Sequence, residues 1–171
     1  MKTTRSIFVI LLLLIPFSTL LAQGVTANTA INNVLTAYYG VKNALAGDNN
    51  SAAQSKAKEL FTAINAVPMD KLTPDQHKIW MAYTDKLQFD SRHISESTAI
   101  DHQREHFTSL SKNMYEVIKG LKVNNTVVYE QYCPMKKATW LSETSAIKNP
   151  YLGKKMLDCG RTTATLNPAG K

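Results

Sequence analysis

Both cysteines of the chain lie in its C-terminal third, and each has a methionine close by. Cys133-Pro134-Met135 holds one such pair, and Met156 precedes Cys159 by three residues. Residues two apart in an extended chain point to the same side, and residues three apart on a helix share a face. Thiolate and thioether sulfurs are soft ligands that select monovalent copper, or silver by analogy, over hard cations. We therefore expect these four sulfur residues to form a site for Cu(I) or Ag(I).

A disulfide between the same two cysteines is the alternative. Cysteines of exported proteins often pair, and a Cys133–Cys159 bridge would stabilise the fold by about 3 kcal/mol on the chain-entropy account. Met135 and Met156 would then be ordinary core residues. A third interpretation combines the two, because the thiols could bind metal when reduced and release it when they are oxidised to the bridge.

Two residues of one amphipathic segment could complete the metal site. His106 lies near the apolar stripe, where a neutral imidazole could bind copper if the C-terminal segment folds over it. Met114 lies two turns further on, on nearly the same side. His102 precedes His106 by one turn, and this pair suits a borderline cation such as zinc or divalent copper. The alternative for His106 is a structural hydrogen bond, and His93 is expected to face solvent.

Four amphipathic segments supply the predicted scaffold. Apolar residues recur at helical spacing over about residues 29–45, 51–66, 74–94 and 98–121. Thr73, Pro74 and Gln76 have the types and spacing of a capping box with proline at the first helical position. Because the connections are short, we expect an all-α fold, an antiparallel four-helix bundle with an irregular C-terminal segment packed on it.

The pattern changes after the fourth predicted helix. Residues 127–132 form a short extended stretch, residues 153–159 could form a short helix, and the last residues of the chain look frayed. Arg104 is expected to pair with Asp101 or with an acid such as Glu143, which would hold the C-terminal segment on the bundle. This segment is therefore predicted to be a cap that carries the sulfur ligands.

The first 22 residues have the pattern of a secretory signal peptide. Lys2 and Arg5 precede an apolar run, which ends at a small-residue cleavage site after Ala22. The alternative is an uncleaved membrane anchor. Cleavage would lower the formal net charge from +7 to +5 and leave residues 23–171 as a single exported domain. No other run of the sequence is long enough to span a bilayer.

Several classes of function have no motif in this sequence. We find no glycine-rich phosphate loop, no Ser-His-Asp pattern and no zinc-protease motif. The two cysteines are too far apart for the Cys-x-x-Cys pair of thiol oxidoreductases, and no platform of aromatic and arginine residues for nucleic acid is present. We therefore expect a binding protein rather than an enzyme, without a nucleic-acid partner.

Further short motifs occur in the order of one known family. They are Gln103-Arg104-Glu105-His106-Phe107, Leu110-Ser111, Tyr132-Cys133-Pro134-Met135, Trp140-Leu141-Ser142, Asn149-Pro150-Tyr151, Gly153, Met156 and Cys159-Gly160. Over about residues 30–160 the chain resembles the bacterial domain of unknown function numbered 3347. In that family the domain occurs alone behind a signal peptide, or attached to periplasmic adaptor subunits of heavy-metal efflux pumps.

The resemblance implies a freestanding periplasmic domain that handles copper or silver. Such a domain would buffer Cu(I) or Ag(I), or donate it to an efflux adaptor protein. The alternative is an envelope protein-interaction module that is pinned by the disulfide and binds no metal.

Overall fold

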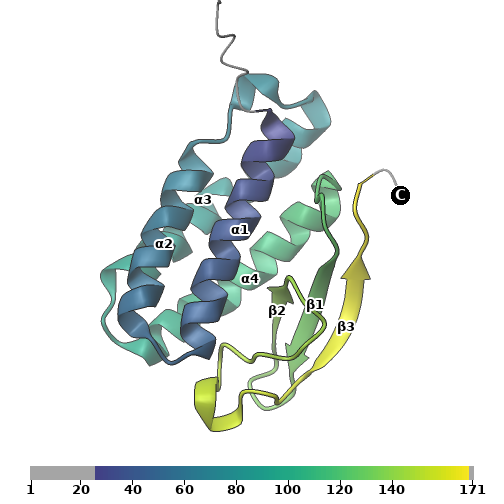
Figure 1. The fold of residues 1–171 in the computed structure, drawn as a ribbon. Helices are drawn as coiled ribbons and strands as arrows, with labels where there is room; N and C mark the ends of the chain where they lie inside the picture. Colours follow the sequence, from purple (N-terminus) through teal and green to yellow (C-terminus); the bar gives the residue numbers. More distant parts are fainter. Residues whose placement is uncertain (1–25, 170–171) are drawn as a thin grey trace, which may run out of the picture.

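Four helices form the larger part of the structure, a computed structural model that describes residues 26–169. They are α1 (Ala27–Ala46), α2 (Asn50–Asn65), α3 (Pro74–Glu96) and α4 (Ile100–Leu121), with the short 3₁₀ helix η1 (Met69–Lys71) between α2 and α3. Successive helices run in opposite directions (Figure 1). The predicted four-helix bundle is therefore confirmed, whereas the predicted signal peptide lies outside the described residues.

The start and end of the helices follow from local sequence. At the start of α3, Thr73 Oγ1 accepts from the Gln76 N–H at 3.3 Å, and the Gln76 side chain accepts from the Thr73 N–H at 3.1 Å. This is the predicted capping box, and Pro74 occupies the first turn. At the same end of the bundle, Lys122 takes a left-handed conformation (φ 51°) and ends α4. Both features satisfy backbone groups that a helix leaves unpaired at its ends.

The C-terminal segment is not irregular, because it contains a three-stranded antiparallel sheet. Its strands are β1 (Val128–Cys133), β2 (Ala138–Ser142) and β3 (Arg161–Leu166), in the order β2-β1-β3. The all-α prediction is corrected in this respect: the fold is a helical bundle with a small sheet. The chain end that looked frayed is β3. It is ordered because the free edge of β1 offers backbone partners to a threonine-rich stretch, and β-branched residues suit a strand.

The sheet packs on the bundle through β2, which lies against α4 and also contacts α1. Tyr38 of α1 joins the three elements. Its hydroxyl lies 2.7 Å from Ser111 Oγ in α4 and accepts from the Leu141 N–H of β2 at 3.0 Å, and its ring stacks on Phe107. The buried apolar residues of the helices and of the sheet thus form one continuous core.

Candidate metal centre

The sheet brings the two cysteines to one end of the β1–β3 ladder. Tyr132 of β1 pairs with Arg161 of β3, so Cys133 follows directly on one strand and Cys159 shortly precedes the other. Gly160 lies between Cys159 and the start of β3 in a backbone conformation that favours glycine, with φ 153°. A Cβ atom there would lie 3.0 Å from the Tyr132 carbonyl oxygen. The chain therefore passes Cys159 close to the end of β1.

Cys133 closes a tight turn and is fully buried. The turn joins β1 to β2, and Lys137 in it takes a left-handed conformation with φ 49°. The backbone N–H of Lys136 donates to Cys133 Sγ at 3.4 Å. Such hydrogen bonds orient cysteine ligands in metal sites.

The second thiol is half-buried and interacts with the first. Burial, and after it the charge and hydrogen bonding of Cys133, raise the pKa of the Cys159 thiol above its ordinary value. Both cysteines are free thiols. A cation that binds the Cys159 sulfur as a thiolate must displace its proton, so metal binding there is coupled to proton release.

Both methionines of the predicted site are exposed. Met135 in the β1–β2 turn is 61 % exposed, and Met156 in the 3₁₀ helix η2 (Gly153–Met156) is 37 % exposed. With Leu157 they account for three of the five large hydrophobic side chains that the described residues expose. Exposure argues against the core-filling alternative for either methionine, since a core residue is buried. Two thioethers are thus accessible in the segments that carry the thiols.

Asn149 shapes the segment that leads to Cys159. This fully buried amide donates from Nδ2 to the Cys159 carbonyl oxygen at 2.6 Å, and its own N–H donates to the Leu157 carbonyl oxygen at 2.7 Å. Its Oδ1 accepts from the N–H groups of Tyr151 and Leu152 at 2.8 and 3.1 Å. One side chain therefore closes the loop that presents Met156 and Cys159.

Arg104 of α4 ties this loop to the bundle. Its Nε donates to the Pro150 carbonyl oxygen at 2.8 Å, and its Nη2 donates to the Leu45 carbonyl oxygen at 3.0 Å and to Asp48 Oδ1 at 2.5 Å. The other oxygen of Asp48 accepts from the Lys154 N–H at 2.8 Å. These bonds hold the pKa of the Asp48 carboxyl below its ordinary value of 3.8. Arg104 therefore holds the C-terminal segment on the bundle as predicted, but its acidic partner is Asp48 and not Glu143.

The acids named for Arg104 in the prediction have other roles. Asp101 is 3.9 Å from the guanidinium and almost fully exposed, so it contributes little. Glu143 instead binds Lys42 of α1 at 2.7 Å and accepts from Asn43 Nδ2 at 2.9 Å. Asp48, which sequence spacing does not connect to Arg104, reaches it because the α1–α2 turn lies beside α4. Glu143 fastens the segment after β2 to α1, and Asp48 fastens it to the α1–α2 turn through the Lys154 N–H.

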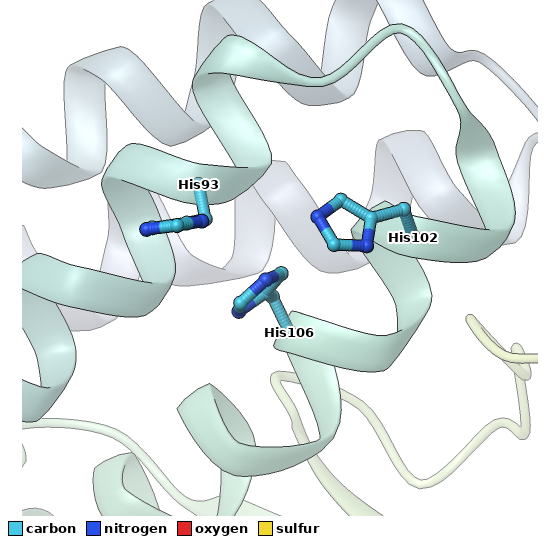
Figure 2. A group of neighbouring side chains, drawn as sticks. All are labelled: His93, His102 and His106. Atoms are coloured by element: carbon cyan, nitrogen blue, oxygen red, sulfur yellow. The ribbon is translucent and has the colours of Figure 1, made fainter.

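His106 takes part in a different group of side chains. Its Nδ1 lies 3.1 Å from Asp90 Oδ1 of α3, and its neighbours are the rings of His93 and His102 (Figure 2). The predicted hydrogen bond of His106 is thus present, while its role in the sulfur site stays a prediction. His93 is half-buried against His106 and Phe89, so the solvent-facing position expected for it is wrong.

Met114 lies in the hydrophobic core and is fully buried. It belongs to the stripe of α4 that faces the other helices. Its surroundings are those of a core-filling methionine, and they do not favour it as a metal ligand. Its predicted coordination of metal stays a prediction.

A comparison with protein-family models assigns the chain to a family. The model described as "Protein of unknown function (DUF3347)" matches residues 34–126, which is more than half of the chain. The chain belongs to the DUF3347 family. The matched part runs from α1 to the stretch before β1, so the sheet and both cysteines of this DUF3347 protein lie beyond it. No curated protein and no solved structure matches the chain. Within residues 26–169, no helix is both long and apolar enough to cross a membrane.

Proposed function

We propose that this DUF3347 protein binds monovalent copper or silver through Cys133 and Cys159. The observation that carries the proposal is the pairing of β1 with β3, which brings two thiols that are remote in sequence to one end of the sheet. Soft thiolates select Cu(I) and Ag(I), and two of them suffice for a linear site. Met135 and Met156 are exposed and lie two and three residues from the cysteines in the chain, so their thioethers are further candidate ligands.

Lysines that lie near the two cysteines in the chain would balance the negative charge of a metal-bound thiolate pair. Lys136 follows Cys133 in the turn, and Lys154 and Lys155 lie in η2 before Cys159. Nearby cations lower the free energy of a thiolate, and a bound monovalent cation leaves one net negative charge on two thiolates for these lysines to balance. An exposed thioether binds Cu(I) weakly and exchanges fast, which suits transfer to another protein.

The biological role follows from the predicted export and from the family resemblance. A periplasmic domain with one soft-metal site would act as a buffer, or as a donor to a heavy-metal efflux adaptor protein. Transfer would occur by exchange of ligands, in which the acceptor replaces the exposed thioethers first and the thiolates afterwards. The chain itself supplies no catalytic group to this role.

A competition titration tests the proposal. Reduced, tag-free protein is titrated anaerobically with Cu(I) against a chromogenic chelator of moderate affinity. We expect one equivalent to be retained, and Cys133→Ser and Cys159→Ser each to weaken the affinity at least tenfold. Met135→Leu and Met156→Leu should weaken it less. Met81→Leu is the matched control, because Met81 is an equally exposed methionine of α3 and should leave the affinity unchanged.

Failure to retain Cu(I) against the chelator would reject the proposal. The disulfide alternative has its own readout, the mass of the protein after alkylation directly upon release from the cell. A chain that takes up no alkylating reagent, together with unchanged function of Met135→Leu and Met156→Leu, would favour a disulfide-pinned interaction module.

A further inference from the structure

Three of the four histidines of the chain meet where α3 and α4 come together. His93 comes from the last two turns of α3, and His102 and His106 lie one turn apart on α4. One ring nitrogen from each lies within 4.8 Å of the other two. Figure 2 shows the three rings turned toward a common space. The ring centroid of His106 lies 4.7 Å from that of each partner.

Asp90 fixes the orientation and tautomer of His106. Its side chain is only 5 % exposed, and its two oxygens are both engaged: Oδ1 with His106 Nδ1 at 3.1 Å, and Oδ2 as acceptor from Ser109 Oγ at 2.6 Å. An ionised carboxylate only accepts hydrogen bonds, so Nδ1 of His106 is the donor to Asp90, and Nε2 is the nitrogen that a neutral ring offers to a cation. A carboxylate behind an imidazole is the usual outer partner of a metal-binding histidine.

The cluster has one closed side and one open side. The Phe89 ring lies 4.2 Å from the His93 ring, centroid to centroid, and covers it, whereas the His102 side chain is 48 % exposed. A cation can therefore reach the cluster past His102. Tetrahedral coordination at about 2.0–2.1 Å requires ligand nitrogens about 3.4 Å apart, and a small rotation of the exposed His102 ring would bring it closer to the other two.

Two of the three rings have structural partners, because His93 contacts Phe89 and His106 bonds to Asp90. The exposed ring of His102 buries little apolar surface, so packing contributes little to its place beside His106. A divalent cation would bind all three rings in their neutral form. Imidazole nitrogen suits zinc and divalent copper, in contrast to the soft sulfur ligands of the sheet.

We propose that His93, His102 and His106 form a second metal site, which takes a borderline divalent cation such as Cu²⁺ or Zn²⁺. Water or an external ligand occupies the open fourth position. Asp90 is a positioning residue that holds His106 and does not touch the metal. This site differs from the proposed thiol site in ligand chemistry and in the elements that build it, so either can fail without the other.

Metal titration of the full-length, tag-free wild-type chain tests this site. Zn²⁺ affinity is measured by competition with a chromogenic chelator, and Co²⁺ serves as a spectroscopic substitute. We expect one equivalent of Zn²⁺, and a Co²⁺ spectrum without a thiolate-to-metal charge-transfer band. His102→Ala and His106→Ala should each weaken binding at least tenfold. His77→Ala, the remaining histidine and exposed on α3, is the matched control and should leave it unchanged.

The Asp90→Asn variant tests the positioning role of Asp90 through Zn²⁺ affinity, which a purely structural role would leave unchanged. We expect about a tenfold loss of Zn²⁺ affinity, the usual effect of losing an outer partner, with the metal stoichiometry unchanged. Circular dichroism confirms that each variant is folded, and His102→Ala keeps the test valid if a change at the less exposed His106 unfolds the chain. Wild-type affinity in His102→Ala, an equal loss in His77→Ala, or a thiolate charge-transfer band with Co²⁺ would overturn the proposal.

Discussion

Gly160 lets the chain after Cys159 pass close to the end of β1. Its φ of 153° and its contact with the Tyr132 carbonyl oxygen leave no room for a Cβ atom. The ring of Trp140 would lie 2.9 Å from that atom on another side. Neither contact involves a flexible side chain that could move away cheaply.

We predict that Gly160→Ala lowers the free energy of unfolding by about 1–3 kcal/mol and also weakens Cu(I) binding. Urea unfolding and the chelator titration measure the two effects. Gly40→Ala is the control, because Gly40 lies within α1 and an added Cβ atom would meet only the flexible side chain of Lys56. The control should be neutral or slightly stabilising. Equal behaviour of both variants would contradict the role given to Gly160.

We predict that Cu(I) affinity depends on pH, because protons compete with the cation for the thiol sulfurs. Burial and the neighbouring Cys133 raise the pKa of Cys159, so protons compete with the cation throughout the neutral range. Affinity should fall as pH falls, by up to about tenfold per pH unit for each thiolate that binds. The titration is repeated from about pH 8 to about pH 6, the range in which a thiol of ordinary pKa stays protonated, with the chelator calibrated at each pH. An affinity independent of pH would indicate thioether ligation alone.

At the scale of elements, the contact between the α1–α2 turn and the segment from Asn149 to Met156 holds the loop of Cys159 in place. Arg104 and Asp48 make this contact, and Gly153 permits it. Gly153 has φ 58°, and a Cβ atom there would clash with both of these side chains. The loop that leads to Cys159 is therefore held on the bundle by an ion pair between the α1–α2 turn and α4.

Asp48→Asn tests this contact through its pH dependence. Because the folded-state pKa of Asp48 is lowered, its charge stabilises the fold above the ordinary pKa of 3.8, and this contribution is lost as pH falls below that value. The wild type should be more stable than the variant at pH 7, and the difference should shrink below about pH 4. Thermal unfolding across this range measures it. Asp85→Asn, at an exposed position of α3, should show no such difference.

At the scale of the whole molecule, Tyr38 connects the bundle to the sheet. Its hydroxyl joins α1 to α4 and to β2, so the helical bundle and the sheet should unfold together. Tyr38→Phe leaves the buried N–H of Leu141 without its acceptor, which costs about 1–3 kcal/mol. Urea unfolding should show this loss in one transition, and amide exchange should rise in β2. Tyr83→Phe, a half-buried tyrosine of α3 beside Lys86, is the control and should change stability little.

The sequence by itself determined the four helices and the start of α3. Helical periodicity and capping depend on residues a few positions apart, so the apolar stripes and the box of Thr73 and Gln76 could be recognised without coordinates. The sulfur motifs could be named for the same reason, because Cys133 and Met135 are near each other in the chain. Whether the two motifs lie together was beyond what sequence spacing can determine.

Only the tertiary structure decided the sheet, the partner of Arg104 and the histidine cluster. β3 exists because β1 has a free edge, and Asp48 reaches Arg104 because two helices turn beside α4. His93 joins His102 and His106 because α3 and α4 pack with these faces together. Each of these contacts links residues that are distant in the chain, and pairing over such distances depends on how the whole core packs, which no local pattern records.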